Sequence, residues 1–109
     1  MRNDKQIRRL LREYAGNAHE IELRQALAPL AEAFRAWERG ELDSFELETL
    51  IHRFHRGAAR ELYVRYATPG AEPAVARAIA TGVLARDSVP AELLEALASL
   101  ITSFNTSPE

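Results

Sequence analysis

Apolar residues recur along most of the chain at three- and four-residue steps, which is the spacing of one face of a helix. Nowhere do four or more apolar and polar residues alternate cleanly between turn signals, as they would in a half-buried strand. Alanine and leucine supply 33 residues, whereas valine, isoleucine and threonine supply 14. Because the first pair favours helices and the second group strands, the sequence predicts an all-α, bundle-like single domain over residues 1–109.

A turn signal, RGELDSFEL, separates the first two predicted helices. Gly40 stands where a helix end favours a left-handed residue, which glycine adopts without steric cost. Asp43 and Glu46 have the spacing of a capping box, in which each side chain caps a backbone N–H of the other residue. We therefore expect an antiparallel helical hairpin, with one helix over 4–39 and the other over 44–67.

Two prolines and a glycine in the segment TPGAEP, residues 68–73, cannot continue a helix and predict a linker. The small apolar residues that follow predict one helix, and the leucine-rich stripe after Pro90 predicts another. We expect a C-terminal helix pair within 74–104, its helices near 73–87 and 90–104, followed by a tail at 105–109.

The apolar face of the first predicted helix changes sides halfway along. On a helical wheel, the apolar residues of the first half share one side, and those of the second half share the opposite side. The first group is Ile7, Leu11, Tyr14, Ala18 and Ile21. The second group is Leu23, Leu27, Leu30, Phe34 and Trp37.

Two arrangements account for this switch. In one, the helix breaks at Gly16–Asn17, where glycine ends one segment and asparagine caps the next, so both halves turn toward one core. In the other, a continuous helix of about 52 Å extends beyond its own domain and buries Ile7, Leu11 and Tyr14 on a partner chain. Pro29 complicates both, since an interior proline kinks a helix. Under either arrangement we expect a homodimer.

The charge balance and the absence of cysteine exclude several classes of function. The chain has 14 basic and 16 acidic residues, a net charge of −2, so it is not a strongly basic or acidic protein. Without cysteine it has no disulfide framework, thiolate nucleophile, zinc finger or iron–sulfur cluster. No apolar run approaches the ~20 residues of a membrane span, and the start RNDKQIRRLLRE lacks an apolar signal core. We therefore expect a cytoplasmic protein with no membrane span and no bound cofactor.

Basic residues cluster at the start of the first helix, on the side of the wheel opposite its apolar residues. The predicted partner-binding surface comprises Ile7, Leu11, Tyr14, Arg8, Arg9 and Arg12. A basic helix start also suits phosphate backbones. Nucleic-acid binding is therefore one alternative for the arginines, and a solvated face is the other.

One face of the second predicted helix carries Glu48, His52 and His55. Two imidazoles and a carboxylate can supply three ligands to zinc or a similar divalent metal and leave a position for water. The sequence has no Glu-x-x-His motif, which argues against a ferritin-like di-iron site. The alternative to a metal site is a surface pair of Glu48 with His52 beside a half-buried His55.

Gly57 interrupts the same helix. A glycine in mid-helix costs about 1 kcal/mol relative to alanine, which indicates close approach of another backbone or of a ligand. The aromatic and basic residues around it suit an anion pocket lined by Arg56, Arg60, Tyr63 and Tyr66. The alternative is ordinary helix packing with amphipathic residues at its rim.

The stretch from Trp37 to Tyr66, with GELDSFEL, IHRFH and GAARELYVRY, resembles short all-helical bacterial proteins of no assigned activity. The resemblance covers under a third of the chain. It implies that the capped turn and the histidine-bearing helix form one unit, and it assigns no catalytic residue.

No catalytic motif is present: the sequence has no Gly-x-Ser-x-Gly elbow, phosphate-binding glycine loop or dinucleotide fingerprint. We therefore expect a non-enzymatic, dimerising protein–protein interaction or regulatory module. The alternatives are a divalent-metal-binding protein or small metal-dependent enzyme, and a nucleic-acid-binding protein.

Overall fold

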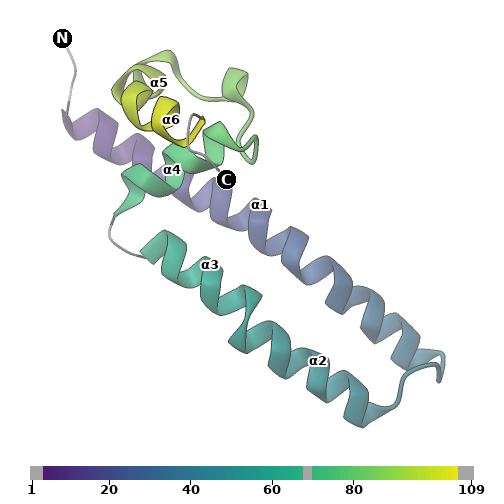
Figure 1. The fold of residues 1–109 in the computed structure, drawn as a ribbon. Coiled ribbons are helices and arrows are strands. Elements are labelled where there is room, and N and C mark those ends of the chain that lie inside the picture. The colour runs from purple at the N-terminus through teal and green to yellow at the C-terminus, as the bar shows by residue number, and fades with distance from the viewer. Residues whose placement is uncertain (1–3, 68–69, 106–109) are drawn as a thin grey trace.

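A single long helix, α1 (Asp4–Glu38), runs the length of the molecule, and the other elements are arranged along it (Figure 1). The computed structural model describes residues 4–67 and 70–105. This part of the chain is all-α and contains no strand. The further elements are α2 (Ser44–Arg56), α3 (Ala58–Ala67), α4 (Ala71–Ala80), the 3₁₀ turn η1 (Arg86–Ser88), α5 (Ala91–Ala96) and α6 (Ala98–Asn105).

The molecule divides into a head and an arm. The head consists of residues 4–18 of α1 together with α4, η1, α5 and α6, and the arm consists of residues 19–38 of α1 with α2 and α3, which return antiparallel beside it (Figure 1). The extents are 60 × 30 × 25 Å and the radius of gyration is 17.4 Å. A compact chain of this size has a radius of gyration of about 13 Å, so the arm projects from the head.

The first helix is continuous, so the predicted break at Gly16–Asn17 is wrong. The helix also passes through Pro29 without ending. The continuous alternative is right about the length of the helix, but it is wrong that a partner chain covers the first half. Ile7 and Leu11 are buried within this chain, because α4 and α5 pack on that half of α1 and supply the opposing apolar side chains.

The buried core lies in the head. Its central side chains are the branched apolar residues of the C-terminal helices, Val75, Ile79, Leu93, Leu97 and Ile101. The alanines of α4 that are predicted to mark close contact are buried as well, at Ala74, Ala76 and Ala78. Because a methyl group is short, α4 can pack closely against both α1 and α6.

The capped turn forms as its sequence predicts. Gly40 has a φ of +79°, the left-handed conformation expected at the end of α1. The amide of Glu46 donates to Asp43 Oδ1 at 2.8 Å, and the amide of Asp43 donates to Glu46 Oε1 at 2.9 Å. These two bonds complete the capping box and start α2 at Ser44, within one residue of the predicted boundaries of both helices.

The second helix of the hairpin is divided at Gly57, contrary to the prediction of one helix over 44–67. A Cβ atom at Gly57 would lie 2.9 Å from the carbonyl oxygen of Arg53. The close approach expected at this glycine is therefore to its own chain and not to another backbone or a ligand. Backbone hydrogen bonds from Gly57 to Arg53 and from Glu61 to Gly57, each 2.9 Å, carry the chain from α2 into α3.

The C-terminal pair is shorter and more broken than predicted. The first helix ends at Ala80 and not at 87, because Gly82 turns the chain with a φ of +84°. The second predicted helix, 90–104, is divided at Leu97 into α5 and α6. The predicted linker is wrong at Ala71–Pro73, which form the first turn of α4, where a proline needs no amide donor. Asn105 belongs to α6, while the rest of the predicted tail and residues 68–69 of the predicted linker lie outside the described residues. Among the described helices, none is both long and apolar enough to cross a membrane.

Two glycine substitutions test this account of the helices. Gly57→Ala should lower the free energy of unfolding by about 1–2 kcal/mol, because the new methyl group meets the Arg53 carbonyl. Gly16→Ala is the matched control, since nothing lies within 4 Å of its added Cβ inside α1, and it should raise that free energy by about 0.5–1 kcal/mol. Urea unfolding followed by circular dichroism measures both, and stabilisation by Gly57→Ala would contradict the steric argument.

Candidate functional site

The arm has almost no core of its own. Leu47 and Leu62, at 5% and 7% exposure, are the two buried side chains among the arm's described residues. The other apolar residues between α1 and α2 are half-buried. A helical hairpin with a single contact seam therefore leaves much of its apolar surface in solvent.

The second half of α1 carries more apolar surface than one neighbouring helix can cover. From Ala33, through Leu30, Phe34 and Leu27, to Ala31, its apolar residues span about 160° on the wheel, whereas a contact with one helix needs a stripe of about 100°. Ala26, Leu30 and Ala33 line a groove on one side of the seam together with Leu50 and Phe54 of α2. Leu27 and Phe34 lie beyond this groove on α1 and are 40% and 42% exposed.

We call this uncovered side of the arm the open flank and define it as Leu23, Leu27 and Phe34 of α1 with Ile51 of α2. Leu27, Phe34 and Ile51 are 40%, 42% and 40% exposed, and Leu23 is half-buried. Ile51 belongs here because it follows Leu50 by one helical step of about 100°, away from the groove that Leu50 lines. The open flank is thus an apolar face that runs along both helices of the arm.

Phe34 is held in place on the open flank. Its ring meets the Trp37 ring edge to face, with centroids 6.4 Å apart and an interplanar angle of 85°. Trp37 is in turn fixed by a 3.0 Å hydrogen bond from its indole Nε1 to Ser44 Oγ at the start of α2. A ring fixed in this way loses little conformational freedom when a partner covers it.

A hollow of about 340 Å³ lies beside Phe34 on the same side of α1. Its lining residues are Glu20, Leu23, Arg24, Leu27, Ala28 and Ala31. Arg24, Leu27, Ala28 and Ala31 stand at steps of three, four and seven residues, which is the diamond that receives a side chain in knobs-into-holes packing. Two alanines leave this diamond open.

The apolar members of the predicted partner surface do not face a partner. Ile7 and Leu11 are in the core of the head. Tyr14 is half-buried and its hydroxyl donates to the carbonyl of Ser88 at 3.2 Å, which ties α1 to η1. This part of the prediction is wrong because the C-terminal helices cover the first half of α1.

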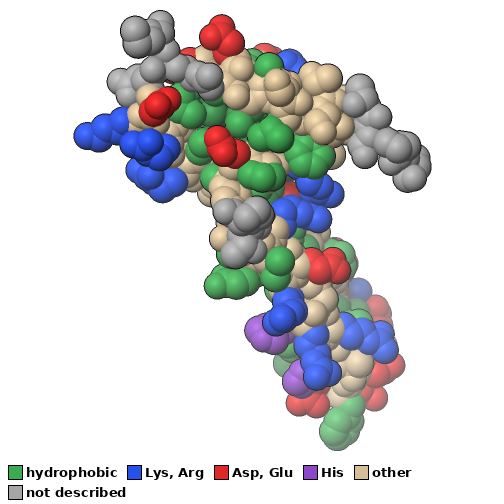
Figure 2. Space-filling view, turned by 60° about the vertical axis from the view of Figure 1, so that its left-hand side comes forward, with side chains coloured by type: hydrophobic (Ala, Val, Ile, Leu, Met, Phe, Trp, Pro, Cys, Tyr) green, Lys and Arg blue, Asp and Glu red, His purple; other side chains and the backbone are tan. Residues whose placement is uncertain are grey.

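The basic members of that surface are exposed. Arg8, Arg9 and Arg12 lie with Lys5 on the solvent side of the first turns of α1, and basic side chains gather at this edge of the head in Figure 2. Arg9 donates to Gln6 Oε1 at 2.8 Å, a contact within the same helix. The basic stripe is thus available to an anionic partner.

The structure does not assemble the predicted metal ligands. Glu48, His52 and His55 are all exposed on α2, and histidines lie at the surface of the arm among basic side chains in Figure 2. In the described ranges, no three side chains of histidine, aspartate or glutamate are grouped as a metal ion would need. No other helix among the described residues adds a ligand to them.

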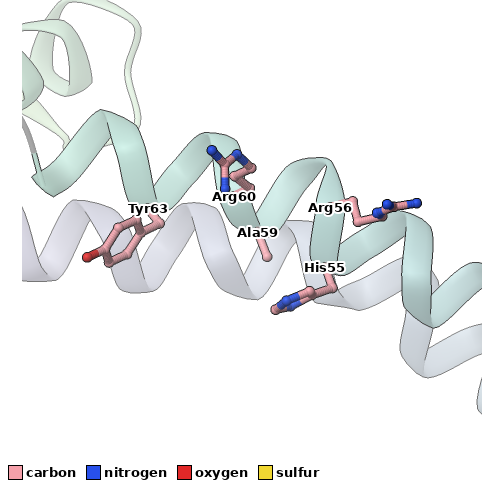
Figure 3. A pocket seen from close by; sticks show the side chains of 5 residues that line it. All are labelled: His55, Arg56, Ala59, Arg60 and Tyr63. Atoms are coloured by element: carbon pink, nitrogen blue, oxygen red, sulfur yellow. The ribbon is translucent and has the colours of Figure 1, made fainter.

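The predicted anion pocket is open and its arginines diverge. A depression of about 680 Å³ is lined by His55, Arg56, Ala59, Arg60 and Tyr63. Figure 3 shows His55, Ala59 and Tyr63 pointing to one side of α2 and α3, while Arg56 and Arg60 point away from them. Tyr66, expected in the same pocket, lies elsewhere, against α1. Without converging cations this surface has no enclosed anion site.

A polar cluster joins α1 to α3 where the arm meets the head. The carboxylate of Glu22 accepts a 2.9 Å bond from Arg65 and a 2.5 Å bond from the Tyr66 hydroxyl. His19 stacks on the Tyr66 ring with centroids 4.8 Å apart. Burial, and then the bond to Glu22, raise the pKa of the Tyr66 phenol well above its ordinary value. The cluster braces the base of the arm.

Comparison of the chain with protein-family models, with curated proteins and with solved structures finds no match. The resemblance of residues 37–66 to bacterial helical proteins stays a prediction.

The three α1 residues of the open flank are visible in the sequence, but their role is not, and Ile51 joins them only in the structure. Leu23, Leu27, Phe34 and their neighbours already stood apart as the second apolar group of α1. Their steps of four, three, four and three residues, read through Leu30 to Trp37, are those of a helix that packs in a bundle. What the spacing could not tell is which half of α1 the rest of the chain covers.

The brace at the base of the arm can be tested with two tyrosines of the same helix. Tyr66→Phe should lower the free energy of unfolding by about 1–2 kcal/mol, because the Glu22 carboxylate loses a donor. Tyr63→Phe is the matched control: Tyr63 is 67% exposed on the outer side of α3 and its loss should change that free energy by less than about 0.5 kcal/mol. Equal effects in urea unfolding would show that the Tyr66 bond contributes nothing.

Proposed function

We propose that this protein is a non-enzymatic interaction module that self-associates through the open flank of its arm. The observation that carries the proposal is the apolar face formed by Leu27, Phe34 and Ile51 on a projecting hairpin with two buried side chains. An apolar face of this extent on a projecting element is typical of a surface that another protein covers.

The energetics favour a covered arm. Full burial of a leucine, isoleucine or phenylalanine contributes about 1.5–3 kcal/mol, so covering these three partly exposed side chains contributes about 1 kcal/mol each per copy. Isolated helices as short as α2 and α3 are only marginally stable in water, so they depend on tertiary packing. A second pair of helices laid on the open flank completes a four-helix bundle, the usual way to bury two apolar stripes per helix.

A second candidate function is binding of nucleic acid through the basic stripe of the head. The specific observation is that Lys5, Arg8, Arg9 and Arg12 are all exposed. They lie at the end of the molecule that is remote from the arm, so association through the open flank leaves them accessible. Phosphate contacts need only such a stripe of cations, without a groove-reading element.

The self-association predicts a concentration-dependent dimer. In sedimentation equilibrium at micromolar to tens of micromolar concentrations, we expect the wild-type chain to dimerise. The double variant Leu27→Gln/Phe34→Gln should weaken the dimer at least tenfold, because each substitution removes an apolar contact in both copies. Glutamine favours helices, so far-UV circular dichroism should be unchanged.

A matched control separates this effect from a general loss of apolar surface. Leu100→Gln/Phe104→Gln removes two side chains of α6 in the head that are 38% and 37% exposed and lie outside the open flank. This variant should dimerise as the wild type does. A wild-type chain that stays monomeric over the whole concentration range would refute the proposal.

The second candidate predicts binding with a strong dependence on salt. If the basic stripe contacts phosphates, the affinity for a short DNA or RNA duplex measured by fluorescence anisotropy should fall roughly 10-fold or more between 50 and 200 mM salt. Arg8→Gln/Arg12→Gln should lower the affinity at low salt, whereas Arg35→Gln/Arg39→Gln at the far end of α1 should not. Binding that is absent at low salt removes this candidate.

A further inference from the structure

The open flank carries both a protruding side chain and the hollow that fits it. Phe34 projects from α1 with its ring fixed against Trp37. The hollow of about 340 Å³ bounded by Arg24, Leu27 and Ala31 begins one turn away on the same side of the helix. In a two-fold symmetric interface, a residue that contacts a second position on the partner is contacted in return by that position. A protruding side chain and a hollow on one face therefore allow two equivalent contacts with a second copy of this chain, the side chain of each copy entering the hollow of the other.

From this pairing, which rests on the proposed self-association, we infer that two copies pack their α1 helices antiparallel, with Phe34 of each in the Arg24–Ala31 hollow of the other. The hollow is centred between Leu27 and Ala28. If Phe34 of one copy lies over that centre in the other, the two-fold axis is halfway between residue 34 and residues 27–28. The axis therefore passes next to Ala31. Ala31 then faces its own copy, and its short side chain lets the helices approach closely.

The shape of the molecule is compatible with the same register. The arm runs along α1 from the edge of the head near Ala18 to the turn at Gly40. With the axis at Ala31, the partner's turn comes level with residue 22, one turn short of the head. The antiparallel partner thus fills the arm without striking the head. A parallel partner would place two heads side by side, and heads wider than an arm hold the two open flanks apart.

The charges at the edge of this face are complementary in the same register. Arg24 comes level with Glu38 of the second copy, since the two positions lie seven residues on either side of Ala31. Arg24 is 81% exposed and already bonds Glu20 of its own helix at 2.8 Å, so it would lie between two carboxylates. A parallel pairing would instead set Arg24 against Arg24 and Glu38 against Glu38.

The area of the face suits a stable dimer. The arm is about 30 Å long and two helices wide, about 20 Å, so the pairing covers roughly 600 Å² on each copy or about 1,200 Å² in total. That value reaches the lower end of the range for specific protein interfaces. The open flank is therefore large enough for a second copy to occupy it without help from the head.

Because the chain has no cysteine, single cysteines can report the register directly. Ala31→Cys should form a covalent dimer rapidly under mild oxidation, since the two-fold axis passes beside it and disulfides require Cα atoms within about 7 Å. Arg24→Cys alone should cross-link at least tenfold more slowly, because the two copies of residue 24 are separated by about 21 Å along the helices. A mixture of Arg24→Cys with a differently tagged Glu38→Cys should yield the mixed dimer.

The outcomes separate this inference from the proposed function. If Arg24→Cys cross-links with itself as fast as Ala31→Cys does, the chain dimerises in parallel and the inference is wrong while the proposed function stands. If wild type sediments as a monomer and none of the variants cross-links, both are wrong. A Phe34→Ala substitution in the Ala31→Cys chain should slow cross-linking, and an unchanged rate would refute the role of the knob.

Discussion

The structure depends on one constraint: α1 is about 52 Å long and must be covered on different sides in its two halves. In the head, α4 and α5 cover the first half of α1 and bury Ile7 and Leu11. In the arm, α2 and α3 cover only part of the apolar surface of α1 and leave Leu27 and Phe34 partly exposed to solvent. The coverage is uneven because α4, α5 and α6, the described helices after α3, pack in the head.

Local chemistry made part of this fold predictable. Gly40, Asp43 and Glu46 define the hairpin turn within seven residues, so their pattern predicts both helix ends to within one residue. The switch of the apolar face in α1 was equally visible in the spacing. Its consequence was not, because whether Ile7 meets α4 or a partner chain is decided by tertiary packing. For the same reason the spacing of Glu48, His52 and His55 could not show that no further ligand joins them among the described residues.

The head holds the buried core, and the arm carries the exposed apolar face. The head is a closed core whose alanines allow α4 to sit between α1 and α6. The Glu22 cluster ties α1 to α3 at the base of the arm through Arg65 and Tyr66, so the two helices are fixed to each other next to the head. At the far end, Trp37 and Ser44 fix the ring of Phe34. Association then orders few additional groups, which is the condition for a modest apolar face to bind well.

Small-angle X-ray scattering tests the central claim, that a second copy covers the open flank, most directly. An antiparallel pair with its axis near Ala31 has a mass of twice 12.2 kDa and exceeds the 60 Å extent of one chain. Its ends lie about 40 Å from the axis on each side, so the maximum dimension should be about 80–90 Å. A particle of 12.2 kDa with a radius of gyration near 17.4 Å at tens of micromolar would contradict the account.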